Sequence, residues 1–418
     1  MILPRERCVE LVSSGSELLD GRRLNTHARL LGGELERLGL RLVRDTTVPD
    51  DSAAMRETIL SALQRVDLLF ITGGLGPTSD DITREVVAEI ASRKIVMHEP
   101  TREKNNEWLK RRNRTPNESF DRHALIVEGA AVLSNRAGLA PGERIELDGK
   151  TIVLLPGPPH ELRAILDDHV IPWLRSCIGG DLPLCRSFRF CGTGESDIAM
   201  RLASAGFSEV GLEVAYCARP GDVELRLIAS PSAREKFDQA IALVRKIFPS
   251  EIYSETAGEE IPLELVIGNL LREKKLTLAT AESCTGGLIG HRITNVSGSS
   301  DYFRGGCVSY SNKIKIAQLG VAPETLAKFG AVSEAVAREM AEGVRRVFGA
   351  DIGLSTTGIA GPTGGTAEKP VGLVFIAVAD ARGTVVREMR TGGEREYIKT
   401  VSAQSVFDLL RRRLCDLA

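Results

Sequence analysis

The sequence predicts an α/β protein in three parts: an N-terminal domain built on a parallel sheet (residues 1–172), a small α+β unit (173–256) and a C-terminal α/β domain (257–418). Short apolar runs alternate with helical stretches in the first and last parts, which is typical of parallel strands joined by helices. In the middle, strand-like runs dominate the pattern. A length of 418 residues also favours about three domains over one core.

The elements expected in the first part follow from its apolar pattern. In chain order they are a strand at Val9–Val12, a helix over Leu24–Leu38, a strand at Leu40–Val43, a helix over Ala53–Val66, and strands at Leu68–Thr72 and Ile152–Leu155. Strands spaced by single helices require right-handed crossovers, so they are expected to form a parallel sheet.

The middle part is expected to hold strands at Arg186–Phe190, Gly211–Tyr216 and Val223–Ile228, with helices at Ser196–Ala205 and Ala233–Phe248. The polar stretch Tyr253–Glu260 is typical of a linker, and Pro262 can begin the next helix. In the last part, Ile352–Thr356 and Val371–Ala379 are expected as buried strands.

Composition excludes several classes of protein. The net charge of −2 shows no basic excess, so no nucleic-acid partner is expected, and the one short basic run, Lys110–Arg114, is typical of a solvated helix face. Eight cysteines without a C-x-x-C pair indicate neither a zinc site nor a disulfide framework. No apolar run approaches the ~20 residues that span a bilayer, so a cytoplasmic protein without membrane contact is expected.

A glycine-rich turn follows the strand Leu68–Thr72, at Gly73, Gly74 and Gly76. Bare backbone at the carboxyl end of a parallel strand can approach a phosphate, so this turn is a candidate phosphate site. The neighbouring Asp80 and Asp81 would repel a phosphate unless a divalent cation lay between them, which makes them candidate metal ligands. The alternative is that one of them caps the next helix. Further candidates in strand-end loops are Glu17, Asn25, Asp50 and Asp51.

The first part resembles the competence/damage-inducible protein A (CinA) family, whose N-terminal domain has the molybdopterin-binding fold. The segments that carry the resemblance are Gly15–Leu19, Gly73–Thr78, Asp80–Thr83, Ala140–Gly142 and Leu155–Pro159. The resemblance implies an ADP-ribose pyrophosphatase that needs a divalent metal (Mg²⁺, Mn²⁺ or Co²⁺) and forms AMP and ribose 5-phosphate. One residue and one segment depart from the family: Ser16 replaces a threonine, and Asp121–Ala124 replaces a stretch rich in Asn, Arg, Lys and Gln.

Ser283 and Cys284 lie where the apolar run Leu276–Ala279 breaks and two glycines precede a helical stretch. At such a strand-to-helix turn an enzyme can expose a nucleophile among free backbone N–H groups, which would hold an oxyanion. The alternative is an ordinary connection of small residues. A serine needs a base, and His291 is the only histidine of this part, so a Ser/His/Asp triad is poorly supported.

A desolvated lysine can act as the base instead, and Lys313 and Lys315 are the candidates, with the Tyr310 hydroxyl as a relay. Cys284 is the rival nucleophile. The loop Thr356–Gly365 and Arg395 are expected to hold the phosphate of a substrate, through backbone N–H groups and a guanidinium. For Arg395 the alternative is a surface ion pair.

This part resembles the nicotinamide-nucleotide amidase (PncC-like) domain of the same family, in segments that cover nearly the whole domain, from Thr280–Gly287 to Gly393–Arg395. The resemblance implies that nicotinamide mononucleotide and water give nicotinate mononucleotide and ammonia, without a cofactor, in a homodimer. It assigns Ser283 as nucleophile, Lys315 as base, five residues after the assisting Tyr310, and as substrate-binding residues Thr285, Gly286, Gly287, Thr357, Gly358, Ala360, Gly361, Gly364 and Arg395.

The prediction is therefore an enzyme of pyridine-nucleotide salvage with two activities. One alternative is an amidase whose N-terminal domain only binds nucleotides or dimerises. The other is a binding protein without catalysis, with a role in competence. A smaller hypothesis concerns Lys313, whose charge two residues from Lys315 would shift the pKa of that lysine.

Overall fold

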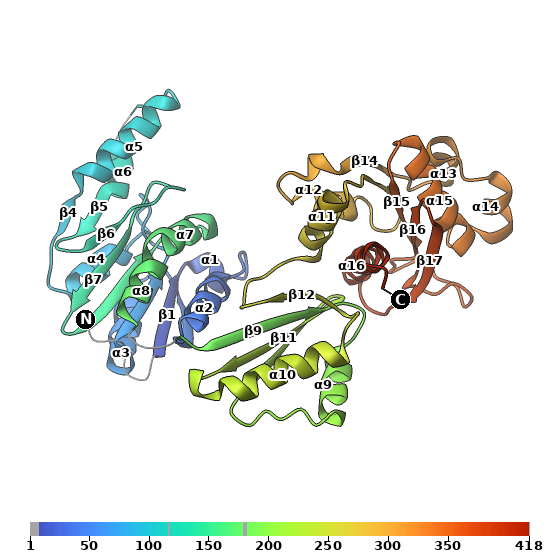
Figure 1. The fold of residues 1–418 in the computed structure, drawn as a ribbon. Helices are drawn as coiled ribbons and strands as arrows, with labels where there is room; N and C mark the ends of the chain where they lie inside the picture. The colour runs from blue at the N-terminus through green and yellow to red at the C-terminus, as the bar shows by residue number, and fades with distance from the viewer. Residues whose placement is uncertain (1–7, 116–117, 179–181, 418) are drawn as a thin grey trace. The chain divides into compact units, whose positions relative to one another are not determined.

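In the computed structural model the described residues are 8–115, 118–178 and 182–417, and the chain divides into two compact units, Met1–Pro183 and Leu184–Ala418 (Figure 1). Each unit is built around its own sheets and cores. Within the described ranges, no helix combines the length and the apolar character needed to cross a bilayer.

The first unit holds a six-stranded sheet in the order β2-β1-β3-β8-β7-β6. Its first four strands, which are parallel, are β2 (Arg41–Val48), β1 (Cys8–Ser14), β3 (Leu68–Thr72) and β8 (Lys150–Leu155). The expected parallel sheet is confirmed for these strands. The sheet continues with two antiparallel strands that the sequence pattern did not predict, β7 (Gly142–Leu147) and β6 (Ala131–Leu133).

Helices cover both faces of this sheet, and each face has its own apolar core. One core contains Leu31 and Leu35 of α2 (His27–Arg37), and the other contains Met55 and Ile59 of α3 (Ser52–Arg65). Burial on both faces explains the near-continuous apolar runs of β3 and β8. The remaining helices and short strands are α1 (Ser16–Leu19), α4 (Thr83–Ile90), β4 (Ile95–Met97), α5 (Glu99–Arg111), α6 (Glu118–Asp121), β5 (Leu125–Val127), α7 (Pro159–Ile165) and α8 (Ile171–Cys177).

The second unit begins with a four-stranded antiparallel sheet in the order β10-β11-β9-β12. Its elements are β9 (Leu184–Phe190), α9 (Glu195–Ser204), β10 (Glu213–Arg219), β11 (Asp222–Ala229), α10 (Arg234–Ile247) and β12 (Ile252–Thr256). The three expected strands and two expected helices are all present. The expected linker at Tyr253–Glu260 was wrong in its first half, because the Tyr253 side chain is buried and its hydroxyl donates to Asp222 (3.0 Å).

The rest of the unit holds a five-stranded sheet in the order β14-β13-β15-β16-β17, in which the first three strands are parallel and the last two antiparallel. Its elements are α11 (Leu263–Lys274), β13 (Leu278–Glu282), α12 (Leu288–Thr294), β14 (Phe303–Val308), α13 (Asn312–Leu319), α14 (Pro323–Phe329), α15 (Glu334–Val347), β15 (Ile352–Gly358), β16 (Leu373–Asp380), β17 (Gly383–Arg390) and α16 (Arg395–Leu414).

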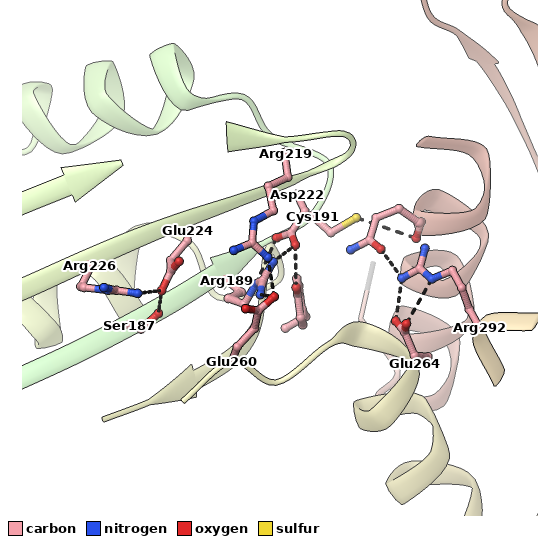
Figure 2. Close-up of polar contacts among 12 residues, drawn as sticks. Ser187, Arg189, Cys191, Arg219, Asp222, Glu224, Arg226, Glu260, Glu264 and Arg292 are labelled. Atoms are coloured by element: carbon pink, nitrogen blue, oxygen red, sulfur yellow. Dashed lines mark hydrogen bonds and ion pairs between the residues drawn. The ribbon is translucent and has the colours of Figure 1, made fainter. Parts of the chain in front are cut away.

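Helix α16 joins the two sheets of the second unit. Cys191 and Tyr253, from the four-stranded sheet, belong to the same apolar core as Ile398 and Phe407 of α16. Figure 2 shows the polar contacts at this junction, including the one between the Cys191 thiol and α16.

Candidate functional sites

The turn after β13 is shaped by the carboxylate of Glu282, the last residue of that strand. This buried carboxylate accepts hydrogen bonds of 2.8–3.0 Å from the Thr285 hydroxyl and from the backbone N–H groups of Gly287, Ile289 and Gly290. The first N–H groups of a helix have no carbonyl partner within it, and here a side chain takes that place. The expectation of free N–H groups at this helix start was therefore wrong for these three residues.

Ser283 follows directly, and Lys315 reaches it from α13. Lys315 Nζ donates to Ser283 Oγ at 3.0 Å and to the backbone carbonyl of Ser309 at 2.7 Å. The Lys315 side chain is only 1 % exposed, and burial lowers its pKa. A lysine with a lowered pKa is more often neutral near pH 7 and can then accept a proton.

Cys284 is buried beside Ser283, and burial raises the pKa of its thiol to about 12. A thiol is nucleophilic only as the thiolate, so this thiol is the poorer nucleophile at neutral pH. His291 lies further along α12, where its Nε2 contacts the side chain of Asn295 (3.2 Å). The structure thus joins Ser283 to a lysine.

Tyr310 and Arg395 meet at the surface. One Arg395 nitrogen, Nη2, donates to the Tyr310 hydroxyl at 3.0 Å, and the other, Nη1, donates to the Gly361 carbonyl at 2.7 Å. The Tyr310 side chain is 62 % exposed. Among the described residues, the partner of the Tyr310 hydroxyl is Arg395. The part of Tyr310 that approaches Lys315 Nζ is its backbone carbonyl (3.5 Å) and not its hydroxyl.

The loop after β15 supplies the remaining residues that the resemblance implied. Its first part is buried: the Thr357 hydroxyl donates to the Ala331 carbonyl (2.7 Å), and Ala360 and Gly361 lie inside. Gly364 is exposed, and Gly358 is half-buried. Thr285 is fully buried, and its hydroxyl bonds to Glu282 and Thr356, so it supports the turn from within.

Lys369 is a further residue of this region whose role the sequence did not indicate. Its ammonium group donates to the carbonyls of Phe329 (2.6 Å) and Val332 (2.8 Å), which ties the glycine loop to the turn before α15. The only signal in the sequence was that Lys369–Gly372 is one of the segments that resemble the amidase domain.

The first unit has a cavity of about 770 Å³ at the carboxyl ends of its parallel strands. Of the expected residues, Gly73, Gly74, Gly76, Glu17, Asp80 and Asp81 line it, as does Asp50. Gly73 has a positive φ, and a side chain there would collide with the carbonyl of Ser14 on β1. The turn therefore needs glycine for its close approach to the neighbouring strand.

Of the other expected polar residues, Asn25 and Asp51 are held within the fold, and Asp50, although it lines the cavity, is hydrogen-bonded as well. The Asn25 side chain accepts from the His27 N–H (3.0 Å) and donates to Thr47, so it shapes the start of α2. Asp51 caps α3 by accepting from Ala54 N–H (2.9 Å). Asp50 accepts from the hydroxyls of Ser14 and Ser16, both at 2.9 Å, and from the Ser16 N–H.

The carboxylates of the cavity do not form a ready metal cage. Among the described residues, no three or more His, Cys, Asp or Glu side chains are grouped as metal ligands. One oxygen of Asp81 accepts from the N–H (2.9 Å) and the hydroxyl (2.5 Å) of Thr78. Magnesium is commonly held by one or two carboxylates together with substrate phosphates, and the cavity residues fit a shared site of that kind.

His27 forms part of the cavity wall and was not among the expected residues. Its Nε2 lies 2.7 Å from the Gly157 carbonyl, which can only accept, so this nitrogen carries the proton and Nδ1 accepts from Thr72. Burial lowers its pKa. The lowered pKa favours the neutral imidazole, and both of its nitrogens have partners within the fold.

The segment that departs from the family pattern also reaches the cavity. Arg122 forms an ion pair with Glu85 (3.0 Å), while His123 lines the cavity and bonds through Nδ1 to the Phe120 carbonyl (3.1 Å). Trp108 and Arg112 line the same cavity, with the guanidinium 3.8 Å from the ring centroid.

Three family models match the chain. They are a probable molybdopterin binding domain over residues 10–176, the KH domain of the damage-inducible protein CinA over 185–254, and the CinA C-terminal domain over 260–414. A protein of Acetivibrio thermocellus is 42 % identical over 409 residues, with 98 % of this chain and 99 % of that protein covered. The chain belongs to the CinA family. The expected fold is confirmed: a molybdopterin-binding sheet, a KH-like antiparallel sheet and a C-terminal α/β domain.

A second relative matches nearly the whole length of the chain. A CinA-like protein of Kosmotoga olearia is 41 % identical over 413 residues, with 98 % of this chain and 99 % of that protein covered. Among solved structures, the competence/damage inducible protein CihA of Agrobacterium tumefaciens is 40 % identical and covers 38 % of this chain and 99 % of its own, with a TM-score of 0.36. The comparisons make this a CinA-family chain with an amidase-type C-terminal domain.

Proposed function

We propose that the C-terminal domain is a serine amidohydrolase that converts nicotinamide mononucleotide to nicotinate mononucleotide and ammonia, in pyridine-nucleotide salvage. The observation that supports this most is the 3.0 Å contact between Lys315 Nζ and Ser283 Oγ. A hydroxyl paired with a buried lysine is a nucleophile with its own base.

In the proposed reaction, neutral Lys315 takes the proton of Ser283 while Oγ bonds to the carboxamide carbon. The tetrahedral intermediate collapses, the C–N bond breaks, and the departing nitrogen takes the proton from Lys315 to leave as ammonia. Water then attacks the resulting ester, Lys315 accepts its proton and returns it to Oγ, and the carboxylate product is released.

Arg395 is proposed to bind the substrate phosphate. Two of its nitrogens hold the Gly361 carbonyl and the Tyr310 hydroxyl, which orient the guanidinium, and its side chain is exposed. A guanidinium has five N–H donors, so donors remain for an anion. The role of Tyr310 in this arrangement is to position Arg395.

The test is product analysis with the full-length protein. We expect ammonia and nicotinate mononucleotide to form in equal amounts from nicotinamide mononucleotide. If neither forms, the proposal is wrong. If nicotinamide is released instead, the enzyme cleaves the glycosidic bond, and the assignment of Ser283 to the carboxamide fails.

For the N-terminal domain we propose hydrolysis of ADP-ribose to AMP and ribose 5-phosphate. The support is a cavity of about 770 Å³ that combines a glycine-rich turn with the carboxylates of Glu17, Asp80 and Asp81. A divalent metal (Mg²⁺, Mn²⁺ or Co²⁺) would be held by Asp80 and Asp81 together with the diphosphate, and would neutralise its charge. The C-terminal reaction needs no cofactor.

A second candidate for this domain is nucleotide binding without turnover. Two observations favour it: an Asp81 oxygen already accepts from Thr78, and no three His, Cys, Asp or Glu side chains are grouped in the described part of the chain. ADP-ribose that binds without forming AMP at any of the three metals would establish this candidate and exclude the pyrophosphatase.

A further inference from the structure

The middle domain, residues 184–256, contacts helix α16 of the C-terminal domain through several hydrogen bonds. Arg411 of α16, which is 4 % exposed, donates to the carbonyls of Ser250 (2.5 Å) and Ile252 (3.3 Å) in the middle domain. The thiol of Cys191 donates to the carbonyl of Gln404, also on α16 (3.9 Å; Figure 2). All three contacts have a backbone carbonyl as the acceptor, so they fix the position of the helix relative to the middle domain.

The turn between β10 and β11 makes the closest approach. Gly221 has a φ of +73°, and a side chain there would press on Cβ of Gln404 at 3.1 Å and on the Val401 backbone at 3.5 Å. The turn thus needs glycine both for its conformation and for its contact with α16. Packing this tight fixes the helix laterally.

Buried ion pairs lie on both sides of this contact, on α16 and in the middle domain. On α16, Asp408 is 1 % exposed and pairs with Arg411 and Arg412, each at 2.7 Å. In the middle domain, Asp222 pairs with Arg189 and accepts from the Tyr253 hydroxyl (3.0 Å). Separating the two sides would leave donors of Arg411 without partners, which is costly for a buried charge.

The side chain of Gln404 on α16 links this contact to the helix that follows the Ser283 turn. The Gln404 side-chain carbonyl accepts from Arg292 Nη2 (2.7 Å), and the same nitrogen donates to Glu264 (2.6 Å; Figure 2). Arg292 also lies over the Phe407 ring, 4.8 Å from its centroid. Arg292 belongs to α12, which directly follows the Ser283 turn, so α12 and α16 are joined at a single guanidinium.

The two helices begin at the two halves of the proposed site. Helix α12 starts after Ser283, and α16 starts at Arg395. Gln404 is nine residues along α16, about 14 Å at 1.5 Å per residue, and one uninterrupted helix connects it to Arg395. The position of α16 therefore sets the distance between the nucleophile and the guanidinium that holds the phosphate.

The middle domain has few features of a nucleic-acid-binding module. KH domains clamp nucleotides with a G-x-x-G loop, and residues 185–254 contain no such sequence. The same residues hold nine basic and nine acidic side chains, so the domain has no positive excess to attract a phosphate backbone. Ion pairs further engage basic residues, such as Arg201 with Glu251 and Arg226 with Glu224.

We propose that the middle domain is a positioning element of the C-terminal site, which holds α16 so that Arg395 and Ser283 stand at the spacing of one nucleotide substrate. The proposal rests on the proposed function for its substrate. Arg411 is the positioning residue through which the middle domain acts, and it touches no reacting atom.

The experiment compares Arg411→Met with Arg413→Met in the full-length protein. Both residues are on α16, but the Arg413 side chain pairs with Asp380 (2.8 Å) and donates to the Gly383 carbonyl, both in the C-terminal domain, so it is a matched control. The Michaelis constant and kcat are measured with nicotinamide mononucleotide and with the same nucleoside lacking its phosphate.

We expect Arg411→Met to raise KM for the mononucleotide about fivefold with kcat within twofold, because binding to the phosphate is weakened. For the nucleoside, both variants should match the wild type, since Arg395 has no phosphate to hold. A general loss of folded protein would lower the apparent kcat for both substrates alike. Equal KM values for the mononucleotide in Arg411→Met and Arg413→Met would overturn the proposal.

Hydrogen exchange supplies a readout that does not depend on activity. Arg411→Met should speed exchange of the backbone amides in residues 395–404, at the far end of α16, whereas Arg413→Met should not. If the wild type releases no ammonia, the proposed function fails and this comparison still decides whether the middle domain positions α16. Unchanged exchange there would overturn the positioning role.

A second variant, Arg411→Lys, keeps the test usable if Arg411→Met does not fold. Lysine keeps the positive charge beside Asp408 but can reach only one of the two carbonyls, so its effects should lie between those of the wild type and Arg411→Met. An Arg411→Lys protein that folds with wild-type KM and wild-type exchange would contradict a role for the paired carbonyl contact.

Discussion

Lys315 Nζ lies 3.0 Å from Ser283 Oγ, and the lysine side chain is almost wholly removed from water. The same amine nitrogen also donates to the backbone carbonyls of Ser309 (2.7 Å) and Tyr310 (3.5 Å), and no carboxylate of the described residues bonds to it. A buried cation without a bonded anion favours the neutral amine. The pH dependence of the proposed amidase follows from this pair.

The rate at low substrate should rise with pH until Lys315 is neutral and then level off. Because burial lowers the Lys315 pKa, the plateau should begin below the ordinary lysine value of 10.5. Below the plateau, kcat/KM should change about tenfold per pH unit, as expected for one essential base. A pH–rate profile for ammonia release checks this, and a rate independent of pH from 6 to 10 would contradict it.

Lys313→Ala should leave that profile unchanged. Burial is the main cause that lowers the Lys315 pKa, and Lys313 is exposed, so water and ions screen its charge. A profile displaced in Lys313→Ala would restore the earlier hypothesis that this neighbouring charge tunes the base.

Cys284→Ala should keep ammonia release within about threefold of the wild type, since only a small buried side chain is lost. The reason is that a thiol with a pKa of about 12 is protonated at neutral pH and cannot act as the nucleophile. Steady-state rates at pH 7.5 are compared, with circular dichroism as a control of folding. A folded Cys284→Ala protein without activity would show that the Cys284 thiol, and not Ser283, is the nucleophile.

Tyr310→Phe separates two roles for the tyrosine. If the hydroxyl positions Arg395, as the 3.0 Å contact indicates, KM for nicotinamide mononucleotide should rise about two- to fivefold while kcat changes little. Arg395→Ala should raise KM further, about tenfold or more. A drop in kcat of a hundredfold in Tyr310→Phe with normal KM would instead show a proton relay.

Asp81→Asn tests the N-terminal site. Asparagine can still accept the Thr78 N–H, but it lacks the charge for a metal, so AMP formation from ADP-ribose should fall at least about tenfold. Asp51→Asn is the matched control, because Asp51 also accepts a backbone N–H at a strand end but does not line the cavity. Equal turnover in both variants, or turnover in excess chelator, would exclude the proposed metal role.

Periodicity and glycine positions were enough to predict the parallel strands of the first unit and the strands and helices of the middle. The antiparallel strands β6 and β7 were missed for different reasons: β6 has only three residues, and the charged residues of β7 interrupt its apolar pattern. Tyr253 was placed in a linker because its neighbours are polar. Its burial depends on Asp222, 31 residues earlier, which no local pattern contains.

For the sites, local chemistry identified Ser283, but Lys315 was chosen over Lys313 only through the resemblance. The structural reason is that Ser311 caps α13, and the helix that follows carries Lys315 inward. The role of Glu282 was missed because its partners are backbone N–H groups of Gly287, Ile289 and Gly290, which only the folded turn brings to the carboxylate. Asn25 was predicted to contact a ligand because it lies in a strand-end loop. Its side chain instead accepts from the His27 N–H at the start of α2.

The most direct test of the account is ammonia release from nicotinamide mononucleotide by four purified proteins: wild type, Ser283→Ala, Lys315→Ala and Lys313→Ala. The account predicts release by the wild type and by Lys313→Ala, with a loss of at least about 1,000-fold in each of the other two, because nucleophile and base act as a unit. Substantial release by a folded Ser283→Ala or Lys315→Ala protein would contradict it.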